Sequence, residues 1–227
     1  MFFSAASSSH SAMQVLNSVA ETTLNESSVN NNMGGHATMH AGFTNGGTER
    51  RGLIQFDVSG IPSGSTITSV TLQLTVPSGN TANSPNFALH RMNTVWGEGN
   101  KSGNNGAAAG AGEATWNDSG FGAWATPGAG SGTDYVAAAS ANTNVLGLGS
   151  YNWSSSGLSA DVQAWVDGTA NNGWILIETT SVSGTARRFS SNGAPTLTVV
   201  YTPVPEPSSV ALLGLGGIAL ILRRRKA

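Results

Sequence analysis

The ten residues Ile67-Thr68-Ser69-Val70-Thr71-Leu72-Gln73-Leu74-Thr75-Val76 decide the fold class of this chain. From Val70 onward, apolar and polar residues alternate: the apolar set is Val70, Leu72, Leu74 and Val76, and the polar set is Thr71, Gln73 and Thr75. Successive side chains of a β-strand point to opposite faces, so this period of two predicts a strand with one buried face and one exposed face. Strands with one buried face and one solvent-exposed face are typical of antiparallel sheets.

The same alternation continues on both sides of this stretch. It is clear at Ile54–Val58 and at Thr196–Tyr201, and Gly, Asn, Ser and Pro separate the strands. One stretch, Leu158–Val166, has helical spacing instead, with apolar residues at i, i+4 and i+7. We therefore predict an all-β chain: a jelly-roll-like antiparallel β-sandwich with one short helix.

A Gly-, Ala- and Asn-rich segment, residues 97–132, interrupts this pattern. Structureless insertions of such length are uncommon inside compact domains. We expect a surface lobe that is held in place by its tryptophans.

Charge and cysteine content exclude several kinds of function. The chain of 227 residues has a net charge of −2, and the part before Glu206 holds six basic and eleven acidic residues. A mildly acidic body argues against nucleic-acid binding and against avid binding of anionic glycans through charge alone. The chain has no cysteine, which excludes disulfides and thiolate metal sites.

The C-terminal tail has three consecutive parts. Pro205-Glu206-Pro207 forms an extended linker, the apolar run Val210–Leu222 spans 13 residues, and a basic cluster of Arg223, Arg224, Arg225 and Lys226 follows. We predict a single transmembrane helix, short against the roughly 17–25 residues of a comfortable span, with the cluster on the cytoplasmic side. Four units result: residues 1–13, a signal-peptide remnant or disordered start; 14–202, the sandwich; 203–209, the linker; and 210–227, the helix with its basic tail.

This tail resembles the PEP-CTERM sorting signal of Gram-negative bacteria. The resemblance implies recognition by an exosortase, removal of the membrane segment, and delivery to the cell surface or the exopolysaccharide matrix. The protein would then be exported and only transiently anchored in the inner membrane. An ordinary single-span anchor and a buried core helix are the alternatives, and the terminal basic cluster argues against the second.

The body resembles a DNRLRE domain, a disaggregatase-related β-sandwich that is often treated as similar to carbohydrate-binding modules. The likeness rests on Arg51–Pro62, which reads RGLIQFDVSGIP, followed by Ile67–Val76. Shorter matches follow in the family's order: Trp96-Gly97-Glu98, Thr115-Trp116, Asp161–Val166, Asn171–Trp174, Arg188-Phe189 and Pro195–Tyr201. They extend the resemblance over Val15–Thr202.

Few residues indicate catalysis or metal binding. His36 and His40 would share a face on a helix, but their β-like surroundings favour ordinary histidines over a zinc site. Glu98, Glu113 and Asp118 could converge as the carboxylate pair of a glycoside hydrolase, although loop acids are usually solvated. Asp57 and Asn31 could hold a structural Ca²⁺, and no other cofactor is expected.

The six tryptophans are the most informative side chains. Trp165 and Trp174 follow the core periodicity. Trp124 and Trp153 lie among small polar residues, so we expect them as exposed rings that contact carbohydrate.

The sequence is compatible with two specific functions and with a third, simpler one. The first is a non-catalytic surface protein that binds or structures extracellular polysaccharide. The second is a polysaccharide lyase or hydrolase with the same tail. The third is a structural matrix protein without a specific ligand. The expected partners are an exosortase-type enzyme, polysaccharide and the membrane, with no nucleic acid.

Overall fold

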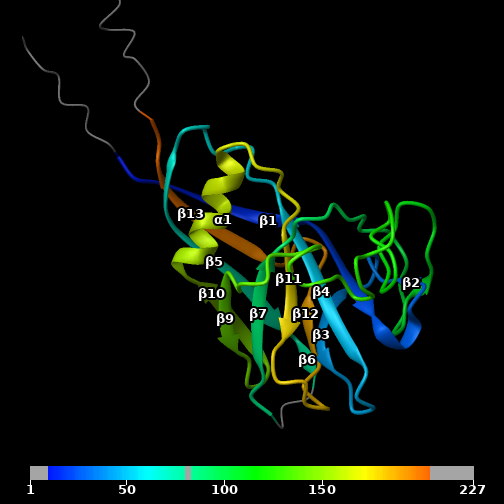
Figure 1. The fold of residues 1–227 in the computed structure, drawn as a ribbon. Helices are drawn as coiled ribbons and strands as arrows, with labels where there is room; N and C mark the ends of the chain where they lie inside the picture. The colour runs from blue at the N-terminus through cyan, green and yellow to red at the C-terminus, as the bar shows by residue number, and fades with distance from the viewer. Residues whose placement is uncertain (1–9, 80–82, 205–227) are drawn as a thin grey trace, which may run out of the picture.

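The computed structural model describes residues 10–79 and 83–204, which fold into a sandwich of antiparallel strands with one α-helix among the described residues (Figure 1). The elements are β1 (Ala12–Asn25), a 3-10 turn (Glu26–Ser28), β2 (Asn31–Asn32), β3 (Thr38–Phe43), β4 (Glu49–Phe56), β5 (Thr66–Val76), β6 (Ser78–Gly79), β7 (Asn86–Arg91), β8 (Ala107–Ala108), β9 (Ala141–Asn144), β10 (Gly149–Ser154), α1 (Ser156–Val166), β11 (Trp174–Glu178), β12 (Arg187–Ser190) and β13 (Thr196–Thr202).

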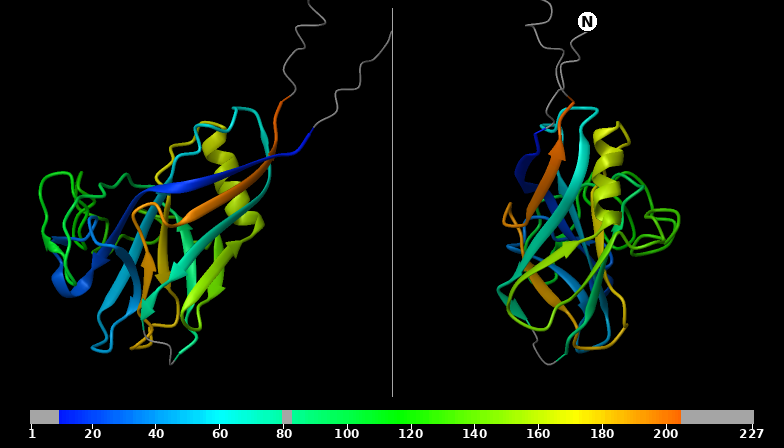
Figure 2. Two further views of the ribbon diagram at one scale, coloured as in Figure 1. Left: turned by 180° about the vertical axis from the view of Figure 1, so that it is seen from behind. Right: turned by 90° about the vertical axis from the view of Figure 1, so that its left-hand side faces the viewer.

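The long strand β1 belongs to both layers of the sandwich. Its first half, Ala12–Asn17, pairs with β13 in a sheet of order β10-β5-β13-β1. After a register shift between Ser18 and Ala20, its second half pairs with β4 in a sheet of order β1-β4-β11-β7-β9. Strand β3 pairs with both β4 and β12. The two layers are seen side by side in Figure 2.

The core lies between the two layers and confirms the alternation that the sequence shows. Val70, Leu72, Leu74 and Val76 are buried, whereas the residues between them reach solvent. Helix α1 begins two residues before the predicted Leu158, where the hydroxyl of Ser155 accepts a hydrogen bond from the Leu158 amide. Its apolar side chains join the same core. The predicted antiparallel sandwich with one short helix is therefore confirmed.

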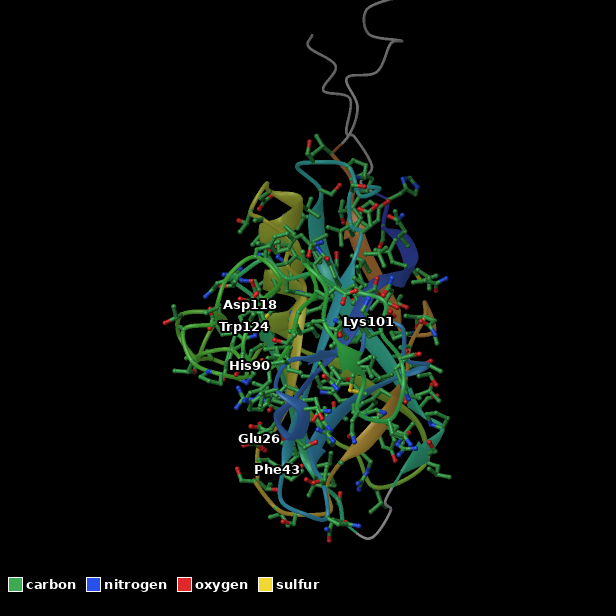
Figure 3. All side chains as sticks on the ribbon, turned by 90° about the vertical axis from the view of Figure 1, so that its right-hand side faces the viewer. Glu26, Phe43, His90, Lys101, Asp118 and Trp124 are labelled. Carbon is green, nitrogen blue, oxygen red and sulfur yellow. The ribbon has the colours of Figure 1, made fainter. Side chains whose placement is uncertain are left out.

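The Gly- and Ala-rich segment forms a lobe on the outer face of the β4–β11 sheet (Figure 3, where Asp118 and Trp124 mark it). Leu53 and Ile175 project from that face into a second apolar cluster with Trp96, Trp116 and Trp124. Arg51 on β4 fastens the lobe, because its guanidinium donates to the carbonyls of Gly128 and Ala129 and lies 5.4 Å from the centre of the Trp116 ring. The expectation of a lobe that is held by tryptophans is confirmed.

Strand β1 begins at Ala12, two residues before the expected boundary at 14, and runs unbroken to Asn25. The expected transmembrane helix at Val210–Leu222, the Pro205-Glu206-Pro207 motif and the cluster Arg223–Lys226 lie outside the described residues. Within the described ranges, the structure contains no helix that is long and apolar enough to cross a membrane.

Candidate functional site

The two tryptophans that we expected on the surface are buried, and that expectation is wrong. Trp153 is 0% exposed and donates its indole N–H to the carbonyl of Phe87, and Trp124 is 5% exposed and donates to the carbonyl of Thr115. The prediction of exposure rested on the small polar neighbours of each tryptophan in the sequence. In the structure, each ring packs against residues that are distant along the chain. Neither ring has a free face for a sugar. Trp165 and Trp174 are buried as expected.

The candidate catalytic acids accept hydrogen bonds from backbone amides, those of the lobe for Glu113 and Asp118 and one of β1 for Glu98. Glu98 accepts from the amide of Glu21, and Asp118 accepts from the amides of Gly120 and Gly122. Glu113 accepts from Gly110 and pairs with Lys101 at 3.2 Å, and the hydrogen bond from the Gly110 amide lowers its pKa. A carboxyl with a lowered pKa, such as that of Glu113, is a poor general acid near neutral pH, whereas burial raises the pKa of Glu98.

The candidate metal ligands do not converge. The rings of His36 and His40 meet edge to face at 5.1 Å, and no group of three or more His, Asp or Glu side chains able to hold a metal occurs in the described residues. Asp57 follows the end of β4, whereas Asn31 contacts Asn105 near the start of that strand. The pair proposed for Ca²⁺ is therefore separated by the length of β4.

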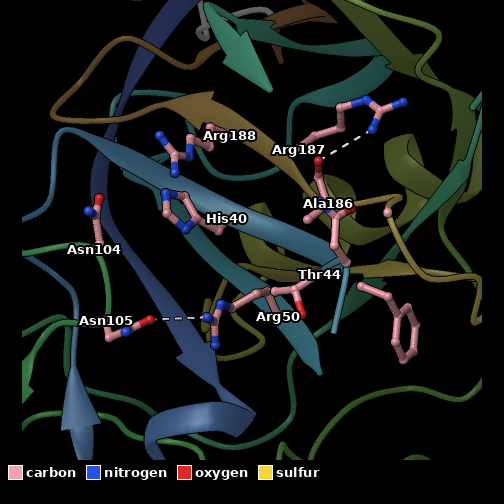
Figure 4. A pocket seen from close by; sticks show the side chains of 11 residues that line it. His40, Thr44, Arg50, Asn104, Asn105, Ala186, Arg187 and Arg188 are labelled. Carbon is pink, nitrogen blue, oxygen red and sulfur yellow. Dashed lines mark hydrogen bonds between the residues drawn. The ribbon is translucent and has the colours of Figure 1, made fainter. Parts of the chain in front are cut away.

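A pocket of about 510 Å³ opens where β3, β4 and β12 meet the lobe (Figure 4). This volume is within the range of small-ligand sites. Among the described residues, its lining holds three basic side chains in addition to His40, and no acidic one. The residues are His40, Phe43, Thr44, Asn45, Arg50, Asn104, Asn105, Gly184, Ala186, Arg187 and Arg188.

Strand pairing brings the basic residues together. His40 on β3 is the register partner of Arg188 on β12, and Gly42 on β3 is the partner of Arg50 on β4. Residues two apart on one strand share a face, so Arg188, His40 and Arg50 lie along one surface. Gly42 has no side chain, so it adds no bulk to this surface between His40 and Arg50. It has φ 101°, and a Cβ there would lie 2.8 Å from the carbonyl oxygen of Thr185.

The basic side chains differ in what they already bind. Arg187 is fully buried and donates to backbone carbonyls, among them those of Asn83 and Thr185. Arg50 is held by Ser27 and Asn105, with N–O distances of 3.0 Å and 3.2 Å, and burial lowers its pKa. The Arg188 residue is exposed, and its guanidinium has no hydrogen bond or ion pair within the described part of the chain. It is the cation that is left free for a ligand.

The pKa of His40 is lowered from its ordinary 6.5 to about 3. Burial is the largest cause, and the nearby His36, Arg188 and Arg50 act in the same direction. The imidazole is consequently neutral near pH 7 and can act as a hydrogen-bonding group. The acidic net charge of the body therefore hides a local basic site.

Residues 12–149, more than half of the chain, match the family profile of carbohydrate-binding module family 96. The chain belongs to this family. The family 96 match covers the strands that supply His40 and Arg50 and the loop with Asn104 and Asn105, but it ends before Arg188. Residues 203–226 match the PEP-CTERM protein-sorting motif, as the sequence indicated. No curated protein matches the chain.

Sequence reasoning missed Arg50 and Arg188 as site residues. The signal was weak, because Arg188 lies far along the chain from His40 and Arg50, and only the pairing of β12 with β3 brings it to them. One hint was present, since Arg187-Arg188 is a basic pair in a body with six basic residues before Glu206.

Proposed function

We propose that this family 96 protein is an exported, non-catalytic protein that binds an acidic extracellular polysaccharide in the pocket between β3, β4 and β12. One observation carries the proposal: Arg188 and Arg50 flank His40 in a pocket that no acidic residue of the described ranges lines. A uronate carboxylate is a planar anion that an arginine fork can hold through two parallel hydrogen bonds. Asn104, Asn105 and Thr44 supply amide and hydroxyl groups for the sugar hydroxyls.

The position of the pocket suits a protein that is tethered by its C-terminal tail. Ala12 pairs with Tyr201, so both ends of the described chain lie at one end of the sandwich (Figures 1 and 2). Arg50 pairs with Asn25 at the opposite end of β1. At roughly 3.3 Å per residue, the length of β1 separates the pocket from the tail by up to about 40 Å. A membrane-held chain would present the pocket away from the bilayer.

The alternative function, a lyase or hydrolase, has less support. Glu113 and Asp118 accept hydrogen bonds from their own loop, and Glu98 does so from β1. No carboxylate from the described part of the chain lines the basic pocket, where it could act as an acid or a nucleophile. Binding without turnover fits these side chains better.

Affinity electrophoresis tests the proposal. In gels that contain polygalacturonate, the purified chain should migrate more slowly than in gels without it, and 0.5 M NaCl should remove most of the retardation because salt screens the ion pair. No reducing or unsaturated sugar ends should appear on long incubation. Mobility that is unchanged by acidic polysaccharides would instead favour a structural matrix protein, and released sugar ends would favour an enzyme.

The tail should act as a temporary anchor that an exosortase-type enzyme removes. Changing Pro205-Glu206-Pro207 to three alanines should leave membrane insertion intact, because the apolar run and the basic cluster are unchanged, but should stop release of the protein to the surface. Mass spectrometry of the released wild-type protein should give a C-terminus near this motif. A released protein that still ends at Ala227 would show that the tail is a plain anchor.

A further inference from the structure

Phe121 has an aromatic side chain that is exposed to solvent at the surface of the lobe. Its side chain is 66% exposed, and it is the one aromatic residue among the large exposed apolar side chains of the described residues. Apolar residues that occur singly on a surface are common, so exposure alone does not make a site. Its surroundings are what distinguish it.

The turn that carries Phe121 is fixed in place. One carboxylate oxygen of Asp118 accepts from the amides of Gly120 and Gly122, and the hydroxyl of Ser119 accepts from the amide of Phe121 itself. Gly120 has φ 95°, and a Cβ at this position would lie 2.7 Å from the carbonyl carbon of Gly112. The backbone therefore cannot turn the ring into the lobe without breaking these contacts.

A second pocket, of about 290 Å³, adjoins this turn, since Gly120 lines it. Its polar lining includes Asn30, Asn117, Asp118 and Glu113. The Asn117 amide donates to the side-chain oxygen of Asn30 at 2.9 Å. This leaves the Asn30 amide nitrogen, the Asn117 oxygen and the second Asp118 oxygen without a hydrogen-bond partner in the part of the chain that the structure describes.

The charge of this second pocket is opposite to that of the first. Asp118 and Glu113 are its charged lining residues, and the hydrogen bond from Gly110 keeps the pKa of Glu113 low. A carboxylate or sulfate ligand would be repelled. Uncharged hydroxyl groups, which both donate and accept, match the free amide nitrogen and the free oxygens.

We infer that Phe121 and the pocket beside it form a second carbohydrate site, which takes an uncharged sugar ring. The phenyl face packs on the apolar face of the sugar, where the negative π-surface meets C–H groups, and Asn30, Asn117 and Asp118 bind the hydroxyls. The site does not depend on the proposed binding of acidic polysaccharide, because it uses other residues and another class of ligand.

Phe121→Ala tests this site without endangering the fold, because the ring lies outside both cores. The probes are three neutral soluble polysaccharides, a mixed-linkage β-glucan, xyloglucan and galactomannan, in affinity gels. The wild-type chain should be retained by at least one, and Phe121→Ala should bind it roughly 3- to 10-fold more weakly. Phe121→Trp, which offers a larger ring, should bind at least as well as wild type.

Two controls separate this site from the basic pocket. Leu148→Ala removes an apolar side chain of similar exposure, 59%, outside the lobe and should not change retention. Arg188→Ala should weaken binding of polygalacturonate and leave binding of the neutral polysaccharide unchanged. Wild-type-like retention of Phe121→Ala, or no retention of the wild-type chain by any of the three neutral polysaccharides, would overturn the inference while leaving the acidic site untouched.

Discussion

Replacing Arg188 with alanine is expected to weaken binding of acidic polysaccharide by about 10- to 100-fold, the loss of one charge-assisted hydrogen-bonded pair. The melting temperature should not change, because the Arg188 side chain is exposed and makes no hydrogen bond or ion pair within the described residues. Arg188→Glu should abolish measurable binding, since a like charge would face the ligand. Arg188→Lys should lie between wild type and alanine, because a lysine keeps the charge but not the planar fork. Affinity electrophoresis at several polysaccharide concentrations measures all of these.

A change of net charge alone must be excluded as the cause. Ser69→Glu provides a matched control, because it shifts the net charge by the same amount as Arg188→Ala and lies on the exposed side of β5, in the other sheet. Its binding should equal that of wild type at moderate salt. Equal losses in Ser69→Glu and Arg188→Ala would mean that the long-range field, and not the pocket, determines binding.

Trp153→Ala is expected to lower the free energy of unfolding by about 3–5 kcal/mol, the usual cost of deleting a large buried aromatic side chain. The indole is 0% exposed, packs edge to face on Phe189 at 6.1 Å, and satisfies the carbonyl of Phe87. Chemical denaturation measures the change, and Phe121→Ala, which truncates an exposed aromatic, serves as the control that should cost little.

Glycan binding separates the two possible roles of Trp153. Well below its lowered melting temperature, Trp153→Ala should still bind acidic polysaccharide, because the ring does not line the basic pocket. A variant of unchanged stability that no longer binds would restore Trp153 as a carbohydrate contact.

The fold was largely predictable because its signals are local. The alternation at Ile67–Val76 and the helical spacing at Leu158–Val166 each report which side of one element is buried. The burial of Trp124, in contrast, has no signal in the residues next to it along the chain. Its neighbours on either side are exposed alanines, whereas its partners in the second apolar cluster include Leu53 and Ile175 on two different strands.

The basic pocket was unpredictable for a related reason. Its charge comes from residues on β3, β4 and β12, and the pairing partners of a strand cannot be read from its own sequence. Net charge pointed in the wrong direction, since it averages over a body whose acids lie elsewhere. The C-terminal sorting motif, by contrast, was recognisable because its parts are consecutive.

The most direct test of the account is an amide NMR titration of the chain with trigalacturonate. If the pocket is the binding site, the shifted amides should cluster at Arg188, His40, Arg50 and the Asn104-Asn105 loop, and Arg188→Ala should suppress those shifts. Saturable shifts that cluster on another face, with the Arg188 and Arg50 amides unmoved, would contradict it.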